Sequence, residues 1–199
     1  MPRVVDHDQR RAEIGAAVMR LVARRGIEAV TVREVAAESG WSTGVLAHYF
    51  RSKEDMLVFA FQATVDSYRR RVEALPTEAG PAAFLREALA GLLPLDETRR
   101  DEMLVWFSFV GRLPGSEHLR RLMRDCYREL SAFLARVIEA GQQAGEFRGE
   151  IVPADEARSL MAFCDGMAMQ HIYEPGDVSQ ADLRRLLDER LTQLRIQAD

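Results

Sequence analysis

The chain has 199 residues, 47% of them hydrophobic and 29% charged, with a formal net charge of −4. This length suits one medium domain or a small domain fused to a larger one, and the composition is that of a soluble protein with a packed core. The longest apolar run falls well short of the roughly 20 residues that span a bilayer, and the first residues lack the apolar stretch of a signal peptide. Cys126 and Cys164 stand far apart without partners at metal-ligand spacing, so we expect a reduced, cytoplasmic protein without a metal site.

The charge is unevenly distributed along the chain. Residues 1–55 contain nine basic and eight acidic side chains, a net charge of +1. The remainder contains 18 basic and 23 acidic side chains, a net charge of −5. The overall acidity argues weakly against nucleic-acid binding, but the N-terminal part can approach phosphate with modest electrostatic help.

Apolar residues recur at helical spacing along nearly the whole chain, which predicts an all-α protein. The first helix is expected from about residue 8 to 25, with Gly26 as a left-handed C-terminal cap. Thr31-Val32-Arg33-Glu34 has the pattern of a capping box and begins a short helix that ends at Gly40. Ser42 caps a further short helix ending near Phe50, and a long helix follows from about 52 to 75.

Five more helices are predicted in the remaining chain, separated by glycine and proline. Their ranges are 82–93, 97–112, 116–144, 154–173 and 180–196. The total is therefore about nine helices.

The segment between Val32 and Phe50 fits a helix-turn-helix. Ala36 is small where two helices would cross closely, and Gly40 lies at the turn, where a positive φ is commonly needed. The third helix is left with a polar or small face that suits a major groove, made of Thr43, Gly44, Ala47 and His48. On spacing alone, an ordinary helical hairpin in a core is the alternative.

The same segment resembles a known family. The residues from Gly40 to Leu57, GWSTGVLAHYFRSKEDML, together with TVREVA at 31–36, are similar to the N-terminal motif of TetR-family regulators. The sequence from Ser42 to Phe50 is most similar to that of the choline-responsive, BetI-type subgroup. The resemblance implies a helix-turn-helix DNA-binding domain at residues 1–55 and a ligand-binding and dimerisation domain at residues 56–199.

The resemblance also implies roles in DNA binding that the side-chain chemistry supports. Helix caps and free amides hold phosphate, guanidinium groups pair with guanine, and small or hydroxyl side chains lie against base edges. The candidates for phosphate contact are Thr31, Ser42 and Lys53, and those for other contacts to the DNA backbone are His48 and Tyr49. Arg33 is the candidate for pairing with guanine, and Thr43 and Gly44 are the candidates for contact with base edges. Ala47 stands where many members have tyrosine, so it offers a thymine-methyl contact without a hydrogen bond. For Thr31 and Ser42, simple helix capping is the alternative.

For the C-terminal part, the family fold implies a cavity that binds a small-molecule effector. The candidate lining residues are Phe61, Asp66, Trp106, Phe109, Tyr127, Phe163, Met167 and His171. For each aromatic residue the alternative is an ordinary core position. A carboxylate among aromatic rings, such as Asp165, would suit an organic cation, an idea taken from the BetI-type resemblance.

The last two helices are expected to form a homodimer interface as a four-helix bundle. The residues expected there are Leu160, Cys164, Ala168, Leu183, Leu187 and Leu191. Burial within one subunit is the alternative for part of this stripe.

Catalytic constellations do not stand out. There is no Gly-rich phosphate loop, His-Glu-x-x-His or Gly-x-Ser-x-Gly motif. Cys164 and His171 are seven residues apart, about 10 Å by helical rise, too far for a direct hydrogen bond. We therefore expect no catalytic residues and no cofactor. The prediction is a regulator, and specifically a repressor, that binds a palindromic double-stranded DNA operator; the alternatives are a helical ligand-binding protein or an enzyme without DNA binding.

Overall fold

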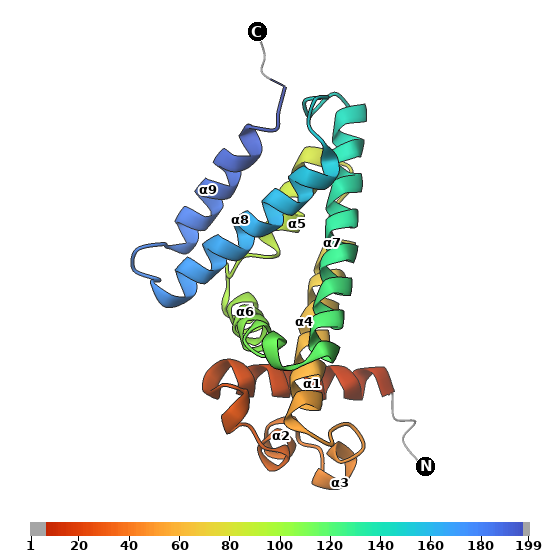
Figure 1. The fold of residues 1–199 in the computed structure, drawn as a ribbon, viewed down its shortest axis with the longest axis vertical. Coiled ribbons are helices and arrows are strands. Elements are labelled where there is room, and N and C mark those ends of the chain that lie inside the picture. The colour runs from red at the N-terminus through yellow and green to blue at the C-terminus, as the bar shows by residue number, and fades with distance from the viewer. Residues whose placement is uncertain (1–6, 197–199) are drawn as a thin grey trace. The chain divides into compact units, whose positions relative to one another are not determined.

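The computed structural model describes residues 7–196 and shows an all-α protein over that range. Its helices are α1 His7–Arg25, α2 Val32–Ser39, α3 Thr43–Leu46, α4 Lys53–Glu73, α5 Pro81–Ala90, α6 Glu97–Val110, α7 Glu117–Gln143, α8 Pro153–Tyr173 and α9 Gln180–Thr192 (Figure 1). Two short 3₁₀ helices, η1 Ile27–Ala29 and η2 Leu113–Gly115, lie between them. The only β-type pairing in the described range is an isolated bridge between Phe147 and Arg195.

The chain packs as two compact units. The first contains the residues up to Ser67 together with 101–119, and the second contains 68–100 together with 120 onward. The division therefore falls within three helices, α4, α6 and α7, each of which contributes residues to both units. The functional boundary expected after residue 55 stays a prediction.

Local capping signals determine the helix-turn-helix part of the first unit. Thr31 and Glu34 form the predicted capping box at the start of α2, and Gly40 ends α2 in the left-handed region at φ 75°. The Ser42 hydroxyl accepts from the Val45 amide at the start of α3. The helices α1, α2 and α3 then bury Ile14, Val35 and Leu46 completely, which makes the core of this part.

The second unit is built around a core shared by α5, α7, α8 and α9. Leu85, Leu134, Leu160 and Leu183 come from these four helices in turn, and all are fully buried. Arg86 on α5 donates from Nε and Nη2 to the two carboxylate oxygens of Asp188 on α9, at 2.6 and 2.9 Å. This bidentate pair fixes α9 against α5 at the edge of the core.

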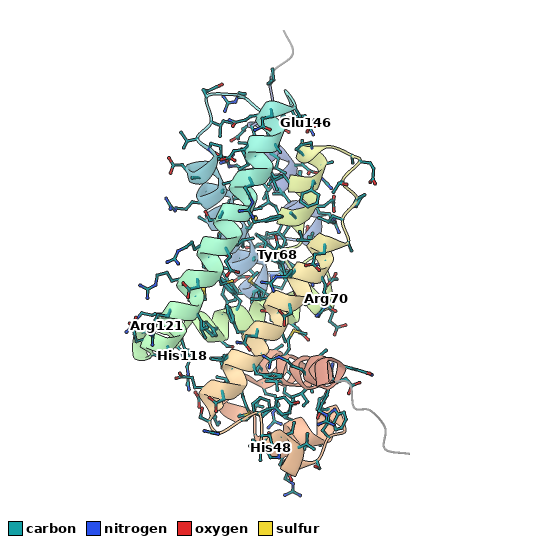
Figure 2. All side chains as sticks on the ribbon, turned by 90° about the vertical axis from the view of Figure 1, so that its right-hand side faces the viewer. His48, Tyr68, Arg70, His118, Arg121 and Glu146 are labelled. Atoms are coloured by element: carbon teal, nitrogen blue, oxygen red, sulfur yellow. The ribbon has the colours of Figure 1, made fainter. Side chains whose placement is uncertain are left out.

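Tyr68 and Glu146 each join separate segments of the second unit by a hydrogen bond. Tyr68 lies among its helices (Figure 2), where its hydroxyl donates to the Ala88 carbonyl at 3.2 Å. Burial raises the pKa of Tyr68, so this phenol stays protonated. Glu146, in the loop after α7, accepts from the Ala82 amide at 2.7 Å and so caps the start of α5.

The predicted elements are present with small shifts at their ends, and two details differ. The α-helix α3 ends at Leu46 rather than near Phe50, because the next amides, those of His48 and Tyr49, bond to carbonyls three residues back. Gly26 has φ 71° but ψ 155°, so it is not the expected left-handed cap. This conformation is essentially confined to glycine, so the residue type is still explained.

Candidate nucleic-acid interface and effector region

The face predicted to contact bases is exposed. Arg33 on α2, Thr43 and Gly44 on α3, and Ala47 after α3 are all exposed. His48 is exposed too, and lies on the turn after α3 at one end of the first unit (Figure 2). Because the apolar side of the same segment is buried through Leu46 and Phe50, the polar side is left for a partner.

The two candidate phosphate-binding hydroxyls act as helix caps. Thr31 Oγ1 accepts from the Glu34 amide at 3.3 Å, and Glu34 Oε2 accepts from the Thr31 amide at 2.9 Å. Hydrogen bonds from Thr31 and from Arg25 lower the pKa of Glu34. Ser42 Oγ accepts from the Val45 amide at 3.3 Å. The capping alternative is thus confirmed for both residues, and their contact with phosphate stays a prediction.

The turn before α3 is held to α1 by Trp41. Trp41 Nε1 donates to Glu13 Oε2 at 3.1 Å, and the Arg10 guanidinium lies 4.5 Å from the centre of the Trp41 ring. No local pattern in the sequence pairs Trp41 with Glu13 or Arg10, although a buried indole N–H usually finds an acceptor. Tyr49 is also held in position, because its ring packs edge-on against that of Phe59 with the ring centroids 5.6 Å apart.

Lys53, the chain's single lysine, is engaged within the first unit. Its ammonium donates to the backbone carbonyl of Glu28 and lies 3.8 Å from Glu28 Oε2. The other carboxylate oxygen of Glu28 accepts from Arg112. Lys53 therefore starts α4 with its ammonium fixed in position rather than moving freely in solvent.

The eight residues predicted to bind an effector fall into two groups, one in each unit. Phe61, Asp66, Trp106 and Phe109 belong to the first unit, and Tyr127, Phe163, Met167 and His171 belong to the second. In the first group, Phe61 stacks on Trp106 and on Phe109, with ring centroids 5.5 and 4.1 Å apart. Phe61 and Phe109 are buried, as the core alternative predicts, and Asp66 is half-buried.

In the second group, Tyr127 donates its hydroxyl to Asp165, and both residues are partly buried. Burial raises the pKa of Asp165, and the hydrogen bond from Tyr127 only partly opposes that rise. Phe163 and Met167 are half-buried against the core. His171 is buried, and its Nδ1 lies 2.6 Å from the Val178 carbonyl in the loop between α8 and α9, while its contact with an effector stays a prediction.

The raised pKa of Asp165 predicts a pH-dependent effect of the Asp165→Asn substitution. A carboxyl whose pKa is higher in the folded than in the unfolded protein lowers the free energy of unfolding once pH exceeds its unfolded pKa. An amide keeps an acceptor for Tyr127 without the charge, so we expect the melting temperature to rise by roughly 2–4 °C at pH 7.5. That gain should shrink as the pH approaches 4; a gain independent of pH would contradict the assignment.

The six residues expected at the dimer interface are placed in the interior of a single chain. All are buried, and none is more than 7% exposed: Leu160, Cys164, Ala168, Leu183, Leu187 and Leu191. On α8 and α9, five of these positions, all but Ala168, belong to the core shared with α5 and α7. All six positions are thus buried within one chain, as the alternative predicts, and their part in a dimer interface stays a prediction.

Two other kinds of feature are absent from residues 7–196, a metal-binding cluster and a membrane-spanning helix. No cluster of three or more His, Cys, Asp or Glu side chains is placed to hold a metal ion in this range. No helix in the described part of the chain combines the length and apolarity needed to cross a membrane.

Two family models match the chain. The model described as "Bacterial regulatory proteins, tetR family" matches residues 14–58, and the model described as "BetI-type transcriptional repressor, C-terminal" matches residues 81–195. The first match covers most of α1, all of α2 and α3 and the start of α4, and the second covers α5 to α9. Both units of the structure contain matched residues.

Individual proteins agree with these matches. The HTH-type transcriptional regulator PksA of Bacillus subtilis (strain 168) is 24% identical over 99% of this chain and 95% of its own length. The crystal structure of a transcriptional regulator from Rhodococcus sp. Rha1 is 30% identical, with a TM-score of 0.78, over 92% of this chain and 95% of that one. A putative transcriptional regulator from Saccharomonospora viridis, solved in complex with choline, has a TM-score of 0.80 at 24% identity, covering 96% and 100% of the two chains.

The relatives are thus named as regulators of transcription rather than as enzymes, in keeping with the helix-turn-helix and its exposed polar face. This chain belongs to the TetR family of bacterial transcriptional regulators, and its C-terminal part is of the BetI type.

Proposed function

We propose that the protein is a cytoplasmic repressor that binds a palindromic operator as a homodimer and is released by a small-molecule effector. The exposed face formed by Arg33, Thr43, Gly44, Ala47 and His48 is the observation that supports DNA binding most directly. Its side chains offer a guanidinium, a hydroxyl, an imidazole and two small surfaces to base edges and phosphates. Tyr49 and Lys53 stand beside this face, and each is held by a contact inside the first unit.

The proposed dimer uses the outward sides of α8 and α9. On α8, Ala162 is exposed, Gly166 is partly exposed, and Met169 and Tyr173 are 45% and 63% exposed. These positions lie three or four residues apart and so share one side of the helix. The two small residues allow a second helix to approach closely, and the two large apolar residues then bury surface area, as isologous helix-pair interfaces require. A monomer at micromolar concentration in sedimentation velocity would refute this part of the proposal.

The proposed effector is a small organic cation. Asp165 is a partly buried carboxyl group that shares its hydrogen bond with the phenol of Tyr127, and apolar side chains including Phe163 pack nearby in the same core. A bound cation would offset the hydration that the ionised carboxylate loses on burial, and it would also contact aromatic faces. The choline complex of the Saccharomonospora viridis regulator, a protein with the same fold, supports this ligand class.

In the proposed mechanism, effector and DNA favour different conformations of the dimer. Helix α4 begins at Lys53 in the first unit and continues to residues 68–73 of the second, so a shift of this helix would affect both. The coupling is reciprocal by linkage: an effector that weakens DNA binding by some factor is itself bound more weakly on DNA by the same factor.

The Thr43→Ala variant tests the assignment of base contacts. Thr43 is exposed at the first position of α3, so losing its hydroxyl and methyl should change which bases are preferred more than it changes general affinity. We expect a preference change of about 1–3 kcal/mol at one base pair in each half-site. Selection of bound fragments from a random pool by both proteins measures this. An unchanged motif, with affinity reduced uniformly, would show that Thr43 does not contact a base.

A further inference from the structure

The connection between α6 and α7, residues 111–116, contacts the DNA-binding part of the first unit at two points. Arg112 donates to Glu28 Oε1, and Ser116 Oγ donates to Glu54 Oε1 at 3.2 Å. Glu28 accepts Lys53 through its backbone carbonyl, and Glu54 directly follows Lys53 in the chain. This connection therefore contacts Glu28, which accepts from Lys53, and Glu54, which is next to Lys53 in the chain.

The Glu28 carboxylate interacts with two cations, one by a direct hydrogen bond and one at a longer distance. Its Oε1 accepts directly from Arg112, whereas its Oε2 lies 3.8 Å from the Lys53 ammonium, beyond hydrogen-bond distance. Lys53 is held by the neutral backbone carbonyl of Glu28 instead. An ammonium has three donors, so Lys53 keeps N–H groups available to another acceptor.

We propose that Arg112 holds the Glu28 carboxylate in a long ion pair with Lys53, short of a direct hydrogen bond, and thereby leaves Lys53 donors for a DNA phosphate. Glu28 is then a positioning residue with two states. While Arg112 binds the carboxylate, the Glu28 carbonyl orients Lys53. When the pair between Arg112 and Glu28 opens, the carboxylate accepts a direct hydrogen bond from the Lys53 ammonium and competes with DNA for it. This inference rests on the proposed function, because it assumes that Lys53 meets a phosphate.

The place of Arg112 in the chain makes this pair a point of control. Residues 111–116 join α6 to α7, and both of these helices also contain residues of the second unit. A shift of either helix would change the distance from Arg112 to Glu28. The side chains of Arg112 and Glu28 are 38% and 70% exposed, so the pair can open without disturbing a core.

A double-mutant cycle on the full chain tests the proposal. The probe is a labelled random-sequence duplex of about 30 base pairs, titrated at several salt concentrations. We expect Arg112→Ala to weaken binding roughly three- to ten-fold and Glu28→Gln to bind at least as tightly as the wild type. In the Glu28→Gln background, Arg112→Ala should then have no further effect, because the competing carboxylate is absent. In a Lys53→Ala background, neither substitution should matter.

Two outcomes overturn the proposal, and they are distinguishable. If the loss caused by Arg112→Ala persists in the Glu28→Gln background, Arg112 acts directly on DNA or through general charge. If the wild type itself lacks salt-dependent binding to the duplex, the proposed function fails as well. Arg121→Ala is the matched control, since it removes an exposed arginine nine positions further along the chain and should leave affinity within about two-fold. Thermal melts of all variants confirm that each remains folded.

Discussion

Lys53→Ala is expected to weaken binding to every DNA sequence and to flatten the salt dependence of binding. Each phosphate contact contributes about 0.9 to the slope of log affinity against log salt. A dimer loses two such contacts, so the slope should fall by up to about 2 and the affinity by roughly ten-fold at moderate salt. Fluorescence anisotropy of a labelled duplex, titrated at four salt concentrations, measures both quantities.

Lys53→Arg is the matched control for that experiment. It keeps the positive charge at the start of α4 and retains donors for the Glu28 carbonyl, so most of the salt slope should remain. A slope that does not change in Lys53→Ala would show that Lys53 makes no phosphate contact. Its bond to Glu28 would then be its whole role.

Phe109→Ala is expected to destabilise the fold by about 3–5 kcal/mol, because it removes a fully buried ring from a packed site. Phe109 is 0% exposed, and its ring lies 4.1 Å from that of Phe61, which is itself 3% exposed. The cavity left behind would be lined by Phe61 and by neighbouring side chains that cannot fully collapse. Urea unfolding followed by tryptophan fluorescence measures the free energy of unfolding.

The adjacent residue supplies the control. Val110 is 40% exposed on the same helix, so Val110→Ala should change the free energy of unfolding by no more than about 0.5 kcal/mol. If Phe109→Ala proved equally mild and altered only the response to an effector, Phe109 would be part of a ligand-binding wall. That result would contradict the core role that its burial indicates.

Much of the fold was predictable because its signals are local. The capping box at Thr31, the glycine at position 40 and the proline and glycine breaks each act within a few residues, and each is present where expected. The exposed face of α3 was predictable for the same reason, because the burial of Leu46 and Phe50 determines which side of the segment is left outside.

Features that depend on tertiary packing were not predictable in the same way. Helix α8 has apolar or small residues on two sides, and periodicity cannot say which side faces its own chain. The side with Leu160 and Cys164 proved to be internal, which leaves the side with Met169 exposed. The contacts around Lys53 were missed because Glu28, and Arg112 that binds Glu28, lie 25 and 59 residues from Lys53 in sequence, and no periodic pattern connects them.

Selection of bound fragments from a random DNA pool by the purified protein, at moderate salt, tests the central claim most directly. We expect an enriched palindrome whose half-sites are centred about 34–36 Å apart, one helical turn, or a multiple of that spacing. That motif would then serve as the probe for effectors that release the protein. A folded, dimeric protein that enriches no motif would contradict the claim that the exposed face of α3 contacts bases.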